Sequence, residues 1–106
     1  MNHGDVRWYT FKAPDKRRPV LILTRNSAIA VLNSVTIAPI TSTIRSIPTE
    51  VVLTEVDGMP NTCAANMDNI QTVPKSNIGE LLVRLTARRL REAALAVSFA
   101  LGFDET

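Results

Sequence analysis

Residues 16–24 read Lys-Arg-Arg-Pro-Val-Leu-Ile-Leu-Thr, so three cations run directly into an unbroken apolar segment. A short apolar run of this kind is typical of a buried β-strand, and we expect that strand to span residues 19–24. Pro19 fixes its own φ and favours extended backbone at Arg18. The guanidinium of Arg18 is therefore expected at the start of a rigid strand, where its planar fork can bind two oxygens of a phosphate.

Further segments with strand composition lie on both sides of this one. The polar segments 12–18 and 41–46 are expected to be loops, and a short helix is expected within 26–32. Pro39 cannot donate a ladder hydrogen bond, so we expect it at a sheet edge or a bulge. The expected strands are 4–11, 34–41, 49–54, 62–66, 69–73 and 78–85. Segments 62–66 and 69–73 form either two strands or one bent strand, and a helix is the alternative for 78–85.

The clearest helix is expected at the end of the chain. Thr86 is a suitable N-cap and Gly102 a suitable C-terminal stop. Three arginines of this segment are expected on a solvated face: Arg88, Arg89 and Arg91. The apolar stripe consists of Leu90, Ala93, Ala94, Val97, Ala100 and Leu101. Several short strands followed by one helix predict a mainly β (α+β) fold, an antiparallel sheet or small barrel capped by the helix.

Length and composition are those of one globular domain, which we expect to span residues 1–106. Cys63 is the only cysteine, so no intrachain disulfide can form, and a reducing compartment is the simpler interpretation. No apolar segment approaches the roughly 20 residues that span a bilayer, and no signal-peptide pattern is present at the N-terminus. We therefore expect a cytoplasmic protein that does not contact membranes.

The charge is unevenly distributed, although the net charge is only +2. Residues 1–48 carry a net charge of +5, residues 49–83 carry −4, and residues 84–106 carry +1. This pattern favours an anion-binding face and a separate acidic face. From charge alone, ordinary solubility explains the pattern equally well.

Metal-dependent and nucleophilic catalysis find little support. One histidine, one cysteine and scattered carboxylates give no zinc-ligand spacing, and the sequence has no Gly-rich phosphate loop, His-Glu-x-x-His or Gly-x-Ser-x-Gly. A Ser-His or Cys-His pair would depend on His3, close to the end of the chain. We therefore expect no metal and no cofactor. The remaining candidates for chemistry are Arg18, Thr41, Thr43 and Asp68, with Lys16, Arg17 and Arg45 as additional cations.

Four motifs occur in an order and spacing that resemble a known family. They are Gly4-Asp5-Val6-Arg7-Trp8, Arg18-Pro-Val-Leu-Ile-Leu-Thr24, Ala38-Pro39-Ile40-Thr41 and Asn66-Met67-Asp68-Asn69-Ile70-Gln71-Thr72. Together they cover nearly the whole chain and resemble the MazF/PemK (Kid) family, small bacterial ribonucleases of type II toxin–antitoxin pairs. The resemblance implies a small SH3-like antiparallel β-barrel with short helices and a C-terminal helix (CcdB/PemK-like).

The resemblance also implies a site. The principal catalytic arginine and threonine of the family correspond to Arg18 and Thr41, and an aspartate that accepts a proton in some members corresponds to Asp68. Those members place an arginine where this chain has Asn66. Many relatives also have a longer Gly-x-Glu-Gln stretch where residues 12–17 are short and basic here. We expect RNA contacts from Lys16, Arg17, Thr43, Arg45 and Asn66.

The implied reaction is sequence-selective, metal-independent cleavage of single-stranded RNA. The ribose 2′-hydroxyl attacks the adjacent phosphorus in line, leaving a cyclic phosphate and a 5′-hydroxyl end. Arg18 would stabilise the charge on phosphorus, Thr41 would donate to a non-bridging oxygen, and Asp68 would act as the base. The implied partners are a cognate antitoxin with an acidic C-terminal segment and a second copy of the chain. Candidate residues for that homodimer interface are Trp8, Phe99, Leu101 and Phe103.

Other interpretations stay open at the level of the sequence. Arg18 alone suits a surface ion pair, Thr41 a backbone contact at a strand end, and Asp68 a turn cap. Trp8 is more typical of a core or a dimer interface than of a base-stacking surface. For the whole protein, the alternatives are a gyrase-poisoning toxin of the same fold, which binds a protein target through its C-terminal helix, and an RNA-binding barrel without turnover.

Overall fold

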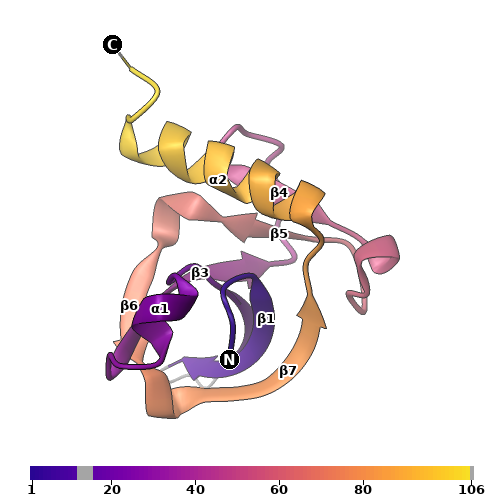
Figure 1. Ribbon diagram of the computed structural model, residues 1–106. Helices are drawn as coiled ribbons and strands as arrows, with labels where there is room; N and C mark the ends of the chain where they lie inside the picture. The colour runs from indigo at the N-terminus through magenta and orange to yellow at the C-terminus, as the bar shows by residue number, and fades with distance from the viewer. Residues whose placement is uncertain (12–15, 106) are drawn as a thin grey trace.

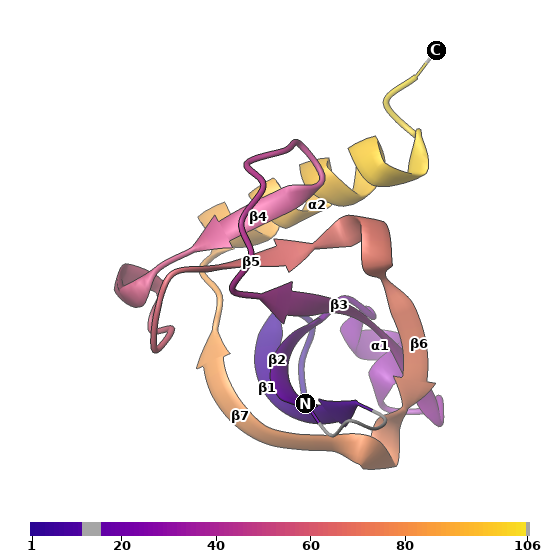
Figure 2. The same cartoon turned by 180° about the vertical axis from the view of Figure 1, so that it is seen from behind.

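The computed structural model describes residues 1–11 and 16–105, whose seven strands form one curved antiparallel sheet in the order β4-β5-β3-β2-β1-β7, with β6 paired to β3. Figures 1 and 2 show β1, β2, β3, β6 and β7 curling into a barrel, while the C-terminal helix lies across β4 and β5. The expected fold is confirmed. The strands are β1 (Asp5–Phe11), β2 (Lys16–Ile22), β3 (Ser34–Thr41), β4 (Glu50–Leu53), β5 (Cys63–Asn66), β6 (Gln71–Pro74) and β7 (Ile78–Arg84).

Two α-helices and three 3₁₀ turns complete the fold, namely α1 (Asn26–Ile29), α2 (Ala87–Leu101), η1 (Glu55–Asp57), η2 (Met67–Asn69) and η3 (Lys75–Asn77). Helix α2 has the bounds that its capping residues predict. The Thr86 side chain accepts a hydrogen bond from the backbone N–H of Arg89 at its start. Gly102 ends it in the left-handed conformation, at φ 80°.

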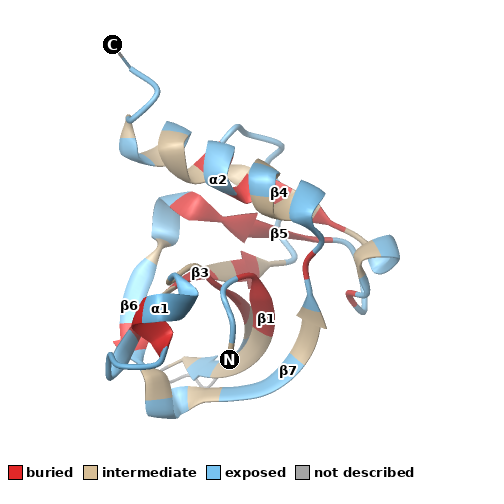
Figure 3. Ribbon diagram, viewed as in Figure 1, coloured by how far each residue is buried: buried red, intermediate tan, exposed pale blue. Residues whose placement is uncertain are grey.

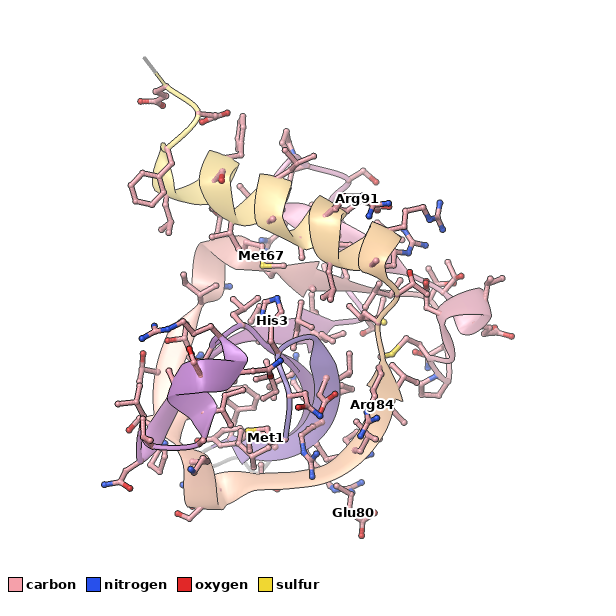
Figure 4. The ribbon with its side chains drawn as sticks, in the orientation of Figure 1. Met1, His3, Met67, Glu80, Arg84 and Arg91 are labelled. Carbon is pink, nitrogen blue, oxygen red and sulfur yellow. The ribbon has the colours of Figure 1, made fainter. Side chains whose placement is uncertain are left out.

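Strand β2 is apolar without interruption because both of its faces are buried. Val20, Leu21 and Ile22 are each 0% exposed. Leu21 packs into a cluster shared by the sheet and α2, whereas Val20 and Ile22 pack into a second cluster inside the barrel. Figure 3 shows the buried residues concentrated in the strands beneath α2, and Figure 4 places Met67 between that helix and the sheet. The two clusters hold β2 firmly on both sides.

The expected start of β2 is wrong. The strand begins at Lys16 rather than Pro19, and it ends at Ile22. The reason lies in β1, which is long enough to supply backbone partners for the basic residues. The additional pairs are Tyr9 with Arg18, Thr10 with Arg17 and Phe11 with Lys16. Part of the expected loop 12–18, residues 12–15, lies outside the described residues.

The expectation of an edge or a bulge for Pro39 is also wrong, because β3 is a central strand. Pro39 pairs with Val20 of β2 on one side. On the other side, pairing with β6 ends at Ile37 and pairing with β5 begins at Ile40. Pro39 therefore lies in the gap between two partner strands, where a missing N–H is tolerated.

The solvated arginine face expected on α2 is wrong for Arg89. Its Nε and Nη2 donate to the two carboxylate oxygens of Asp57 at 2.9 and 3.0 Å, and its Nη1 donates to Glu92 at 2.8 Å. Its side chain is only 16% exposed. Arg88 and Arg91 are exposed as expected, and Figure 4 shows Arg91 on the side of α2 that faces away from the sheet.

The apolar stripe of α2 is correct only in part. Ala93 is buried, and Leu90, Val97 and Ala100 pack against the core. Ala94 and Leu101 are exposed, while Ala96, which lies outside the expected stripe, is buried. The helix therefore rests on the sheet along a narrower and slightly rotated line, leaving apolar surface on its sides.

Candidate active site

The register of β2 and β3 brings Arg18 and Thr41 together. These antiparallel strands pair Val20 with Pro39, and Arg18 lies two residues before Val20 while Thr41 lies two residues after Pro39. Because side chains alternate with a period of two, both project from the face that carries Val20 and Pro39. The backbone ladder stops before them, and the two side chains line the same two hollows at this end of the sheet. Residues 23 positions apart are thus placed opposite one another.

The first hollow, here called the cationic pocket, has a volume of about 220 Å³. No acidic side chain is among the described residues that line it, whereas two arginines are. An opening with two guanidinium groups and several hydroxyl and amide donors is suited to an anion. Its lining residues are Arg18, Pro39, Thr41, Thr43, Arg45, Asn66 and Asn69, which include five of the predicted site residues.

Arg18 is exposed and forms no ion pair with a carboxylate in the described parts of the chain. The surface ion pair, which is the ordinary interpretation of such a residue, therefore does not apply here. The five N–H donors of its guanidinium remain available for a ligand.

Thr41 has a structural contact that leaves its donor free. Its Oγ1 accepts a hydrogen bond from the backbone N–H of Thr43 at 3.1 Å, the strand-end role that threonine often takes. A hydroxyl that accepts in this way still has its own proton to donate. The contact therefore fixes the side chain while keeping its O–H available to a ligand in the pocket.

The segment that follows Thr41 carries the second arginine. Figure 2 shows this connection running from the end of β3 past β5 to the start of β4. One carboxylate oxygen of Glu50, Oε1, accepts the backbone N–H of Arg45 at 2.9 Å and that of Ser46 at 3.2 Å. Glu50 in turn pairs with Asn66 across β4 and β5. The carboxylate thus holds Arg45 beside the pocket through its backbone and leaves the guanidinium unpaired with it.

Asn66 and Asp68 lie at the turn between β5 and β6. Asn66 is 5% exposed, and its Oδ1 accepts the backbone N–H of Asp68 at 2.9 Å. The capping role considered for Asp68 therefore belongs to Asn66. Asp68 is exposed, and its Oδ2 accepts the hydroxyl proton of Thr49 at 2.7 Å. Asn66 and Asn69 line the cationic pocket, but Asp68 itself does not, so its carboxylate lies beside the opening rather than in its wall.

Two further predicted RNA contacts, Arg17 and Lys16, are not among the described residues that line the cationic pocket. Arg17 alternates with Arg18 and so lies on the other face of β2. Its guanidinium carbon stands 4.2 Å from the centre of the Trp8 ring, a cation–π contact. The side chain of Lys16 is outside the described part of the structure, which records only its backbone pairing in β2.

A second hollow, here called the apolar pocket, adjoins the first and has a volume of about 240 Å³. Arg18 and Thr41 belong to both. Its remaining lining residues are Trp8, Pro19, Ile40, Ser42, Met59, Pro60, Asn61 and Cys63. Sequence reasoning missed Ser42, Met59, Pro60 and Asn61, because no local pattern links the segment after η1 to the start of β2.

A larger hollow, about 810 Å³, lies along α2 and away from Arg18 and Thr41. Its walls include Leu23, Leu90, Val97 and Leu101, and Figure 4 shows His3, which also lines it, between the barrel and α2. In the described residues, no three His, Cys, Asp or Glu side chains gather where they could hold a metal ion. None of the described helices is both long enough and apolar enough to cross a bilayer.

Residues 2–101 match a protein family described as the PemK-like, MazF-like toxin of type II toxin–antitoxin systems. This chain belongs to that family. Endoribonuclease MazF3 of Mycobacterium tuberculosis is 42% identical over 90 residues, which cover 85% of each chain. The structure of the M. tuberculosis toxin MazF-mt6 is similar with a TM-score of 0.84 and 35% identity, covering 92% of this chain and 96% of that one.

A mycobacterial endoribonuclease solved in complex with its cognate antitoxin is also similar, with a TM-score of 0.82 and 28% identity. The similarity covers 96% of this chain and 95% of that enzyme. These MazF-like relatives confirm the resemblance seen in the four sequence motifs and the fold it implies.

Proposed function

We propose that this MazF-like chain is a toxin endoribonuclease that cleaves single-stranded RNA without a metal ion, with residues 1–106 acting as one domain. The observation that carries the proposal is the convergence of Arg18 and Thr41 at a cationic pocket, among whose described lining residues there is no carboxylate. Relatives of the chain are named endoribonucleases. Those names favour RNA cleavage over the gyrase-binding alternative and over RNA binding without turnover.

The chemistry follows from the residue types at the pocket. The 2′-oxygen forms a bond to phosphorus as the bond to the 5′-oxygen breaks, which yields a cyclic phosphate and a 5′-hydroxyl. Arg18 stabilises the charge that develops on the phosphorane oxygens, since positioned donors of this kind contribute roughly 10²–10³ in rate. The free proton of Thr41 is donated to a non-bridging oxygen. Thr43, Arg45 and Asn66 hold the backbone of the substrate.

One proton must leave the 2′-hydroxyl and another must reach the 5′-oxygen. No carboxylate or imidazole is among the described residues of the cationic pocket, so the base must come from its rim. Asp68 is the candidate, since it follows Asn66 by two residues and Thr49 orients its carboxylate. A well-placed base contributes roughly 10²–10⁴ in rate. Asp68→Asn should therefore lose at least a hundredfold in rate, whereas Thr49→Val should lose less.

The partners proposed are a second copy of the chain and a cognate antitoxin. An acidic antitoxin segment matches the unpaired guanidinium groups at the cationic pocket, and a relative of this chain is described in complex with its cognate antitoxin. We place the enzyme in the cytoplasm, where it meets its substrate. The exposed apolar side chains of the C-terminal segment suit the homodimer interface, namely Leu95, Phe99, Leu101 and Phe103.

The decisive experiment incubates the protein with a long single-stranded RNA in EDTA. Discrete fragments with 5′-hydroxyl and cyclic-phosphate ends are expected, since no step requires a metal ion. Intact RNA would overturn the proposal. RNA that is retained in a salt-dependent way but never shortened would indicate a binding protein instead.

A further inference from the structure

We infer that the apolar pocket is a nucleobase site, which takes up the base of one nucleotide beside the scissile phosphate and thereby selects where RNA is cut. The inference rests on the proposed function, because it needs a phosphate at Arg18 to place the neighbouring base. It names a class of ligand, a nucleobase, for a pocket that has no role in the proposed cleavage steps. It also gives Trp8 a role other than the core or dimer role expected from the sequence.

The position of the pocket is the first argument. Arg18 and Thr41 line both hollows, so the apolar pocket begins where the proposed phosphate site ends. In single-stranded RNA an unstacked base can turn away from the backbone toward such an opening. A phosphate held by Arg18 therefore brings an adjacent base directly to the apolar pocket.

The walls of the pocket are the second argument. They include Trp8 together with Pro19, Ile40, Met59 and Pro60, while Arg18 is the only cation among the described lining residues. Such a surface suits the flat, uncharged face of a base far better than a second phosphate. A volume of about 240 Å³ is also below the roughly 300–1,000 Å³ of pockets for drug-sized ligands. The pocket therefore suits one ring system.

Trp8 is fixed in place by its neighbour. Arg17 stands over the ring at 4.2 Å yet does not line the pocket, so it contacts the part of Trp8 that the pocket leaves free. A cation over the ring restricts its rotation, and a restricted aromatic ring loses less entropy when a base stacks on it. The basic residue predicted to contact RNA thus supports the base through Trp8.

The remaining polar groups of the pocket provide selection. Asn61 and Ser42 are exposed at its wall, and an amide side chain offers a donor and an acceptor to a base edge. Cys63 is 4% exposed, and burial, with a smaller contribution from the Asp57 charge, raises the pKa of its thiol. The neutral thiol leaves an uncharged surface beneath the base.

The first test combines base removal with substitution of Trp8. A short single-stranded RNA carries an abasic nucleotide on either side of the cut bond, and cleavage is measured with wild type, Trp8→Leu and Trp8→Phe. Removing the base on one side should slow wild type roughly 5- to 150-fold, as base–aromatic stacking implies. The same removal should cost Trp8→Leu little, and Trp8→Phe should behave like wild type. Equal losses in wild type and Trp8→Leu on both sides would overturn the inference.

The second test reads selection directly and uses an exposed residue whose replacement leaves the core intact. A randomised single-stranded RNA is cut by wild type, Asn61→Ala and the control Asn77→Ala, which lies on η3 away from the pocket. Asn61→Ala should relax the base preference at one position beside the cut, and the control should not. Unchanged preference in Asn61→Ala would count against the site. Failure of wild type to cut any RNA would instead refute the proposed function, so the two failures are distinguishable.

Discussion

The guanidinium groups of Arg18 and Arg89 show how differently one fold uses the same side chain. Arg18 is exposed near the start of β2 and is paired with no carboxylate of the described residues. Arg89 is 16% exposed and makes two hydrogen bonds to Asp57, whose side chain is 7% exposed, and one to Glu92. Both residues come from basic clusters that look alike in the sequence.

This difference indicates that burial and a carboxylate partner, rather than the charge of the surrounding sequence, distinguish a structural arginine from a functional one. A buried charge must be compensated within the fold, so Arg89 and Asp57 are needed for stability. An exposed guanidinium without a partner adds little to stability and retains all its donors for a ligand.

The largest effect is expected for Arg18→Ala. Cleavage should slow by at least about 10²–10³, because the donors aimed at the phosphorane oxygens are lost. The free energy of unfolding should change by less than about 0.5 kcal/mol, as for other exposed substitutions. Single-turnover cleavage and urea unfolding measure the two quantities. Arg18→Lys serves as the matched control, since it keeps the charge but loses the planar fork. A large loss of stability in Arg18→Ala would make Arg18 structural and remove the contrast.

Arg89→Ala should show the reverse pattern. Leaving Asp57 nearly buried without its partner should lower the free energy of unfolding by about 2–4 kcal/mol. The cleavage rate of the protein that remains folded should stay close to that of wild type. Arg88→Ala is the control, because Arg88 is an exposed neighbour on α2. Similar unfolding curves for the two variants would show that the ion pair contributes nothing.

The pH dependence of the free energy of unfolding gives a second test of the Arg89–Asp57 ion pair. The hydrogen bonds from Arg89 hold the pKa of Asp57 below its ordinary value of about 3.9. A depressed folded-state pKa means that the stabilisation is present above the ordinary pKa and is lost as pH falls through the folded-state pKa. The stability difference between wild type and Arg89→Ala should therefore narrow as urea unfolding is moved from neutral pH to below pH 4. A constant difference would contradict this assignment.

Sequence signals predicted the elements whose causes are local. The bounds of β3 agree with the segment 34–41 expected from its strand composition, and the ends of α2 agree with Thr86 and Gly102. The start of β2 and the pairing of Arg89 were missed because their causes are remote. The first depends on the length of β1, and the second on Asp57, 32 positions away in the sequence.

As with the fold, the sequence predicted only part of the candidate site. The motifs around Arg18 and Thr41 identified both residues, and the strand register explains why they meet. No motif pointed to Asn61 or Met59, because their place at the site depends on how the segment after η1 returns to the start of β2. The position of Asp68 beside the pocket also depends on the Thr49 contact, which no spacing in the sequence encodes.

Glu50 is intermediate between the exposed Arg18 and the ion-paired Arg89. Its carboxylate holds the backbone of Arg45 but forms no ion pair with the Arg45 guanidinium. It holds the backbone N–H of Arg45, and its second oxygen, Oε2, is buried and has no hydrogen-bond partner among the described residues. It also holds Ser46, whose φ of 55° is otherwise unfavourable for a residue with a side chain. Glu50 should therefore act on RNA binding through the position of Arg45.

Glu50→Ala should weaken binding of a non-cleavable RNA by about tenfold, comparable to one lost hydrogen bond to a charged group. The slope of log affinity against log salt should fall by about one, as for a lost phosphate contact. Arg45→Ala should show the same changes, and the double variant should be little worse than either single one. Glu50→Gln, whose amide oxygen can still accept both N–H groups, should retain most of the affinity. If the losses of RNA affinity in Glu50→Ala and Arg45→Ala simply add, Glu50 does not act through Arg45. Its role is then structural, like that of Asp57.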